Sequence, residues 1–199
     1  MKFSEAIEKV NRIDGSHTDM CADIHLINCQ NGFYDEKVSS IIRKRHRRVN
    51  YIRELGEIGE WMHRAKYDYY TLRELSINAI NVLENMDPDA DFVSEFKNLK
   101  DLFVFEIADI AIYAMDAIGY AKTIPGYVDE YVPFPAMMDE DLLDIFEYMV
   151  DSINHDQTMW MMANAMYEKL ELPVSFERII AFKAVYNSTR GKFHGKIKS

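Results

Sequence analysis

Two short acidic patterns contain the residues of this chain that are best suited to chemistry. Glu54 and Glu57 stand three residues apart in the segment RELGEIGEW. Glu106 and Asp109 repeat this spacing in the segment FEIADIAIYAMD. A helix turns by about 100° per residue, so the two acids of each pair lie on neighbouring rows of one helix face. If the two helices pack antiparallel, the four carboxylates can converge on one point.

The surroundings of the second pair make it unusual. Nearly all other residues of that segment are apolar, which predicts an interior helix. A carboxylate buried there without compensation costs several kcal/mol or takes up a proton. We therefore expect a basic partner, a water-filled cleft or a cation beside Glu106 and Asp109. Asp116, seven residues after Asp109, extends the same stripe.

The chemistry of the donors narrows the choice of cation. Carboxylate oxygens are hard ligands, and without cysteine or a second histidine they favour Mg²⁺ or Mn²⁺ over zinc. A ferritin-like di-iron centre would need two Glu-x-x-His motifs, and the chain has one, EWMH at 60–63. An ExxE pattern alone is common on solvated helix faces, whereas an ExxD pattern within an apolar helix is rarer. Together the two pairs predict a Mg²⁺ site, with Mn²⁺ as a substitute.

Composition limits the class of protein. The 199 residues are 48% hydrophobic and 28% charged, which is typical of a globular protein, and we expect a single domain over 1–199. No apolar run approaches the roughly 20 residues of a membrane span, and the first residues do not resemble a signal peptide. A net charge of −10 argues against general nucleic-acid binding. Cys21 and Cys29 are expected to be buried thiols of a cytoplasmic protein.

The elements that must position the acids are helices. Apolar residues recur at three- and four-residue spacing, and no alternating strand pair or internal repeat is found, so we predict an all-α helical bundle. Turn signals such as DGS, NGFYD, NMDPDAD and ELPVS separate the helices, and the segment TIPGYVDEYVPFPAMMD forms the one long loop. The predicted helices span residues 3–13, 17–30, 37–66, 68–86, 93–120, 139–170 and 175–188.

With both acidic motifs in this order, the sequence resembles the all-α nucleoside triphosphate pyrophosphohydrolases, the MazG-like and dimeric dUTPase superfamily. The ExxE and ExxD pairs match its signature. NGFYD at 31–35 resembles a short aromatic-acidic element of the family, and KAVYNSTRGKFHGKI at 183–197 resembles its basic tail. The resemblance implies a MazG-like fold with an extra inserted helix between the acidic helices, and a C-terminal helix followed by the basic tail.

The resemblance also implies an activity: Mg²⁺-dependent hydrolysis of nucleoside or deoxynucleoside triphosphates to the monophosphate and pyrophosphate, as nucleotide-pool housekeeping. It implies a homo-oligomer, a dimer or tetramer, of which we expect a homodimer. The implied metal ligands are Glu54, Glu57, Glu106 and Asp109. Glu57 and Glu60 are the candidate catalytic carboxylates, and Asp116 would lie behind the ligands or bind a second ion. The implied substrate-binding residues are Lys183, Asn187, Arg190 and Lys196.

A second hypothesis stays open: a catalytically silent helical binding or interaction protein that kept the same fold. The intact acids at all four positions favour the enzyme. Other conspicuous segments are expected to be structural. The basic run RKRHRR at 43–48 is predicted to be a solvated helix face, and MWMMANAM at 159–166 to be core or a subunit interface. Residues 120–182 offer no motif, so the base of the nucleotide is not predicted.

Overall fold

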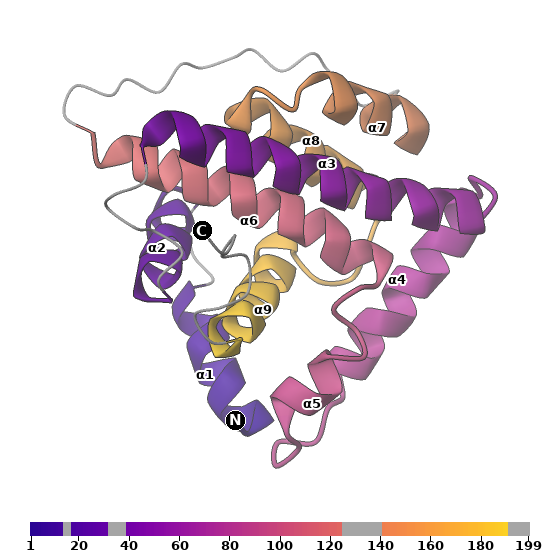
Figure 1. The fold of residues 1–199 in the computed structure, drawn as a ribbon. Helices are drawn as coiled ribbons and strands as arrows, with labels where there is room; N and C mark the ends of the chain where they lie inside the picture. Colours follow the sequence, from indigo (N-terminus) through magenta and orange to yellow (C-terminus); the bar gives the residue numbers. More distant parts are fainter. Residues whose placement is uncertain (14–16, 32–38, 125–140, 191–199) are drawn as a thin grey trace.

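The computed structural model describes residues 1–13, 17–31, 39–124 and 141–190, without the side chains of 17–19. In these ranges the chain forms nine helices and no strand, which confirms the predicted all-α class (Figure 1). The helices are α1 (Phe3–Ile13), α2 (His17–Gln30), α3 (Ser40–Arg64), α4 (Tyr69–Glu84), α5 (Phe92–Phe96), α6 (Phe103–Lys122), α7 (Leu142–Asp151), α8 (Asp156–Lys169) and α9 (Phe176–Thr189).

Helix α6 is the centre of the bundle. It contacts α2, α3, α4, α8 and α9, and nearly all of its residues are buried, as the apolar sequence predicts. Helix α3 runs antiparallel along it, while α1, α2 and α9 lie on another side (Figure 1). The two helices that carry the acidic pairs are therefore direct neighbours. No described helix is long and apolar enough to cross a membrane.

Short polar side chains fix where several helices begin. The side chains of Ser39, Asp68 and Ser175 accept hydrogen bonds from backbone amides of α3, α4 and α9, which would otherwise lack a partner. Asp141 forms a capping box with Asp144 at the start of α7. These caps set the register of α3 and α9, both of which contribute side chains to the candidate site described below.

Two long helices predicted from the sequence are each interrupted. The predicted helix 93–120 is two helices, α5 and α6, joined by a turn at 97–102. The predicted helix 139–170 is also two, α7 and α8, with a break over 152–155, where His155 has non-helical backbone angles. Serine and asparagine in that break compete for backbone hydrogen bonds. Apolar spacing continues through the first break, at Leu99 and Leu102, so periodicity did not reveal it. In the second, the polar residues 154–158 were a signal that the prediction missed.

Aromatic packing holds α9 against the centre of the bundle. The ring of Phe96 lies 4.8 Å from that of Phe105 and 4.9 Å from that of Tyr186, between ring centroids. Phe182 stacks on Phe3 at 6.1 Å. These contacts join α1, α5, α6 and α9, and they fix the face of α9 that carries Lys183.

The methionine-rich segment 159–166 and the two cysteines differ in burial. Four residues of the methionine-rich segment are fully buried, which makes it core: Met159, Met162, Ala163 and Met166. Cys21 is buried as expected, but Cys29 is exposed, and neither cysteine forms a disulfide. The burial predicted for Cys29 was therefore wrong, because it lies in the last turn of α2.

Candidate metal centre

Helices α3 and α6 bring three of the four predicted ligands together. One carboxylate oxygen each from Glu54, Glu106 and Asp109 lies within 4.8 Å of the other two. Glu54 and Glu106 are almost completely buried, and the Asp109 side chain is 16% exposed. We call these three residues the acidic cluster. Glu54 of α3 therefore faces both acids of the α6 pair.

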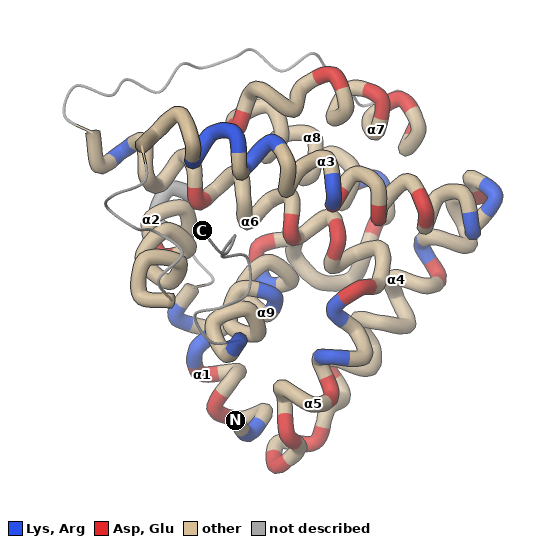
Figure 2. The backbone as a smooth tube through the Cα atoms, viewed as in Figure 1, with Lys and Arg blue, Asp and Glu red and all other residues tan. Residues whose placement is uncertain are grey.

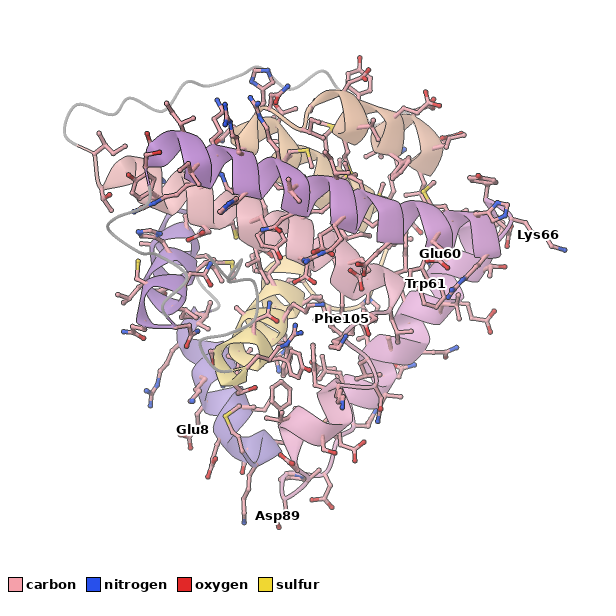
Figure 3. All side chains as sticks on the ribbon, in the orientation of Figure 1. Glu8, Glu60, Trp61, Lys66, Asp89 and Phe105 are labelled. Carbon is pink, nitrogen blue, oxygen red and sulfur yellow. The ribbon has the colours of Figure 1, made fainter. Side chains whose placement is uncertain are left out.

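Glu57 and Glu60 lie outside the acidic cluster. The Glu57 side chain is 43% exposed, and its Oε1 atom is 3.9 Å from Nε of Arg53. Glu57 is still close enough for its charge to raise the pKa of both Glu54 and Glu106. Glu60 is 60% exposed, and its carboxylate pairs with Arg64 at 2.5 Å. Figure 3 labels it toward the C-terminal end of α3. The predicted cage is thus a buried triad with a half-exposed fourth acid beside it.

Helix α9 contributes a buried lysine to the site. Lys183 is 2% exposed, and its Nζ atom lies 2.8 Å from Oδ2 of Asp109. The same ammonium donates a hydrogen bond to the backbone carbonyl of Lys100. Asn187, one turn later, donates from Nδ2 to Oδ1 of Asp109 at 3.4 Å. The resemblance implied that both residues bind substrate; in the structure both contact Asp109.

One buried polar atom of the site has no partner among the described residues. It is Oδ1 of Asn187, which accepts no hydrogen bond from that part of the chain. Buried polar atoms are nearly always paired, so this oxygen suits a donor or a cation at the site. Arg190 caps the end of α9, with its guanidinium 5.7 Å from the ring centre of Tyr186. Lys196 lies outside the described residues.

Burial and mutual repulsion shape the electrostatics of the acidic cluster. Burial, with further contributions from the charges of Asp109 and Glu54, raises the pKa of Glu106 to about 9, although Lys183 opposes the shift. Burial and the charge of Asp109 also raise the pKa of Glu54, against the effect of Arg53. A divalent cation would remove this penalty, because it favours the ionised form of each acid.

Two further residues of the site were not predicted from the sequence. Arg53 donates from Nε to Oε1 of Glu54 at 3.0 Å and from Nη2 to the hydroxyl of Tyr113 at 2.9 Å. The Tyr113 hydroxyl is 3.4 Å from the same oxygen of Glu54. Their positions did carry a signal, since Arg53 directly precedes Glu54 and Tyr113 follows Asp109 by four residues.

Asp116 has a different partner from the acidic cluster. It lies two turns beyond Asp109 on α6, where its Oδ1 atom is 3.0 Å from Nδ1 of His25 on α2. One carboxylate oxygen of Asp116 is therefore engaged by His25, and its role behind the ligands or at a second ion stays a prediction. Among the described residues, the one group of acids, histidines or cysteines close enough to share a metal ion is Glu54, Glu106 and Asp109.

Part of the basic run is structural. Arg47 binds Asp156 of α8 through Nε at 3.3 Å and Nη2 at 3.1 Å, and the hydroxyl of Tyr51 donates to the same carboxylate at 2.9 Å. Lys44, Arg45 and His46 are exposed. The predicted solvated face is therefore present, but Arg47 joins α3 to α8.

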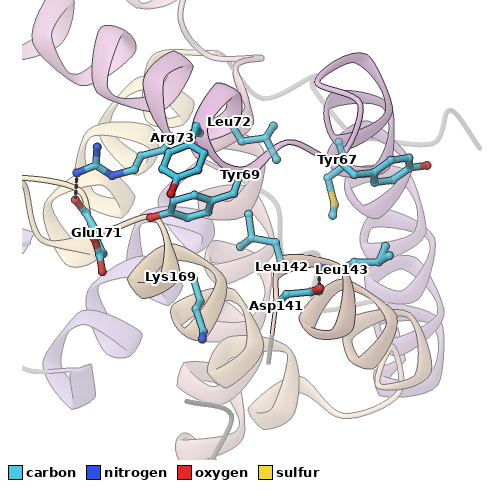
Figure 4. Close-up of a pocket in the computed structure, with 11 residues that line it drawn as sticks. Tyr67, Tyr69, Leu72, Arg73, Asp141, Leu142, Leu143, Lys169 and Glu171 are labelled. Atoms are coloured by element: carbon cyan, nitrogen blue, oxygen red, sulfur yellow. Dashed lines mark hydrogen bonds between the residues drawn. The ribbon is translucent and has the colours of Figure 1, made fainter. Parts of the chain in front are cut away.

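A separate open cavity of about 860 Å³ lies among α4, α7 and α8 (Figure 4). Its lining includes Tyr67, Tyr69 and Tyr70, with Arg73 on one side. Tyr67 and Tyr70 are 57% and 76% exposed, so they are not core residues. None of the predicted site residues lines this cavity.

The donor set fits a small divalent cation. Three carboxylates and a nearby unpaired amide oxygen offer only oxygen ligands, the type that Mg²⁺ and Mn²⁺ prefer. Arg53 pairs with Glu54 and Lys183 with Asp109, whereas Glu106 forms no ion pair with a described residue, so an added cation would favour its ionised form. No protein-family model, curated protein or solved structure matched this chain.

Proposed function

We propose that this protein is a Mg²⁺-dependent hydrolase that cleaves nucleoside or deoxynucleoside triphosphates to the monophosphate and pyrophosphate. The observation that carries the proposal is the acidic cluster itself. An ExxE helix and an ExxD helix place three carboxylates within 4.8 Å of one another in a buried position. We also propose a bundle of the MazG-like type, with α4 and α5 as the insertion between the acidic helices.

The acidic cluster would hold the cation, with Mg²⁺ or Mn²⁺ bound by Glu54, Glu106 and Asp109. When bound, such a cation neutralises charge on phosphate oxygens and lowers the pKa of a coordinated water. The side chain that would orient the attacking water or accept its proton is Glu57. Its half-exposed position and its effect on Glu54 and Glu106 favour it over Glu60, which is paired with Arg64.

The residues of α9 would have two different roles. Lys183 and Asn187 both contact Asp109, so their role is to hold this carboxylate in place. Arg190 follows at the end of α9, and with Lys196 it remains the proposed contact for the polyphosphate. A guanidinium suits this task because its parallel donors match phosphate oxygens.

The test is release of pyrophosphate from a panel of triphosphates with Mg²⁺ or Mn²⁺. We expect the wild type to act on at least one nucleotide and to lose activity without a divalent cation. Glu106→Gln and Asp109→Asn should abolish hydrolysis while the fold persists, since amide and carboxylate are nearly isosteric. Glu74→Gln is the matched control, because Glu74 is an exposed acid of α4 outside the cluster. Equal activity of Glu106→Gln and wild type would contradict the proposal.

A second candidate is the catalytically silent binding protein, and one observation favours it. Arg53 and Lys183 already pair with Glu54 and Asp109, as in a buried ion network that only stabilises a fold. Such a protein would release no pyrophosphate from any triphosphate, and divalent cations would not change its melting temperature. The same panel therefore separates the two candidates.

A further inference from the structure

A second group of chemically capable residues lies between α2 and α6, outside the acidic cluster. Oδ1 of Asp116 is 3.0 Å from Nδ1 of His25, and Nε2 of His25 is 3.5 Å from Sγ of Cys29. The side chains of His25 and Asp116 are 12% and 11% exposed. Cys29 is exposed. We call this chain of contacts the Cys29 relay.

The direction of the hydrogen bonds follows from the chemistry of the groups. An ionised carboxylate can only accept, so Nδ1 of His25 carries the hydrogen that faces Asp116. In the neutral ring, Nε2 then has a lone pair, and it is this atom that faces the Cys29 thiol. Nucleophile, base and orienting acid in this order are the arrangement that activates a cysteine.

Close packing of α2 on α6 allows His25 to contact Asp116. A Cβ atom at Gly119 would lie 2.3 Å from the backbone oxygen of Cys21 and 2.8 Å from Cβ of His25. Glycine at this position therefore lets α2 approach α6 closely enough for His25 to reach Asp116. Cys29 lies one turn after His25 on the same helix face, which brings the thiol to Nε2.

The charged and titratable groups around the Cys29 relay come from α6 and α3. They are Asp116 and Tyr120 on α6 and Arg43 on α3; the Tyr120 ring is 5.8 Å from that of His25 and 5.1 Å from the Arg43 guanidinium. Burial and the charge of Asp116 raise the pKa of the Cys29 thiol, while Arg43 opposes the shift. A base is therefore needed for Cys29 to react at neutral pH.

We propose that Cys29 is a nucleophilic thiol that His25 activates and that forms mixed disulfides with small disulfides. In the step, Nε2 of His25 takes the S–H proton and the thiolate sulfur attacks one sulfur of the disulfide R–S–S–R. A new S–S bond forms between Sγ of Cys29 and one sulfur of the reagent, and the S–S bond of the reagent breaks. The leaving thiolate then takes the proton from His25 to give R–SH. Cys29 is oxidised and one reagent sulfur is reduced.

The test follows modification of the full chain by bis(2-hydroxyethyl) disulfide and by oxidised glutathione, with mass spectrometry and peptide mapping. In the wild type we expect one adduct, at Cys29 and not at buried Cys21. His25→Gln should slow the reaction on the order of tenfold or more at neutral pH, because the base is lost. Leu26→Gln, a change at an exposed position of α2, should react like the wild type.

The pH dependence separates a base from a merely structural histidine. At high pH the thiolate forms without help, so the rates of wild type and His25→Gln should converge. Equal rates of the two proteins at every pH, or no adduct at Cys29 in the wild type, would overturn the proposal. If His25→Gln does not fold, the wild type alone decides: activation by the folded arrangement predicts that Cys29 reacts faster at neutral pH in the folded chain than in the chain unfolded in urea, and an equal or slower reaction of the folded chain contradicts it.

Discussion

Glu106 is ionised with difficulty when no cation is bound. Burial and the neighbouring carboxylates raise its pKa to about 9, from 4.5 in an unfolded chain. The folded state therefore binds this proton more tightly than the unfolded state. The resulting stabilisation is complete below about pH 4.5 and is lost as the pH rises through about 9.

This gives the first prediction at the residue scale. Without divalent cations, the free energy of unfolding of the wild type should decrease between pH 5 and pH 9, and that of Glu106→Gln should decrease less. Urea unfolding with a chelator present measures both slopes. Identical slopes for the two proteins would mean that Glu106 is ionised as easily in the folded as in the unfolded state.

Lys183 gives a second prediction, because it is the buried cation of the site. Lys183→Met leaves Asp109 without its ammonium partner, so the metal-free protein should lose about 3 kcal/mol of stability. The site also becomes more negative, so Mg²⁺ should raise the melting temperature by more than in the wild type. Lys100→Met is the control, since the carbonyl that Lys183 contacts is kept. A smaller Mg²⁺ effect in Lys183→Met than in the wild type would contradict this role.

At the scale of elements, replacing glycine by alanine is expected to change stability in opposite directions at two helix positions. At Gly56 on α3, an added Cβ would meet no atom of the described part of the chain within 4 Å, whereas at Gly119 on α6 it would collide with the backbone of α2. Gly56→Ala should therefore stabilise the protein by roughly 0.5–1 kcal/mol. Gly119→Ala should destabilise it by about 1–3 kcal/mol or more. Chemical unfolding measures both, and equal effects would show that the α2–α6 contact is not as close as described.

Gly56→Ala also probes the surface beside the acidic cluster. Glycine there lowers helix stability with no packing reason among the described residues. If a substrate passes over this position, Gly56→Ala should reduce hydrolysis although it stabilises the fold. Unchanged hydrolysis would mean that the substrate approaches from another side.

The helices show what the sequence could and could not predict. Periodicity and spacing were sufficient to predict the all-α class and the approach of Glu54 to Glu106 and Asp109, because an i, i+3 pair has one geometry on any helix. The breaks that separate α5 from α6 and α7 from α8 were missed, because Leu99 and Leu102 continue the apolar spacing through the first and Ile153 lies within the second. Spacing also could not show that Glu57 points partly to solvent, because a side chain's rotamer depends on neighbours such as Arg53.

At the scale of the whole molecule, α3 presents a surface suited to a second copy of the chain. Ile41, Val49 and Ile52 are 65%, 64% and 56% exposed on this helix. Its first half carries a run of basic residues, and its second half carries both acidic and basic ones (Figure 2). Two antiparallel copies of this helix would bury these apolar side chains against each other around a two-fold axis. This surface is our candidate for the homodimer interface.

The dimer prediction is tested by sedimentation of the wild type and of a variant with Val49→Glu and Ile52→Glu. The wild type should sediment as a dimer and the variant as a folded monomer. Val82→Glu, at a position 53% exposed on α4, is the control and should remain dimeric. A wild type that is monomeric at all concentrations would contradict the prediction, and a dimeric double variant would place the interface elsewhere.

The central claim is that Glu54, Glu106 and Asp109 bind a divalent cation, and direct titration with Mn²⁺, followed by electron paramagnetic resonance of the free ion, tests it most directly. We predict that the wild type removes one Mn²⁺ per chain from solution and that Mg²⁺ displaces it. Glu106→Gln and Asp109→Asn should lose this binding, and Glu74→Gln should retain it. A wild type that binds no Mn²⁺, or a Glu106→Gln variant that binds it as well as the wild type, would contradict the claim and leave the cluster as an ion network neutralised by Arg53 and Lys183.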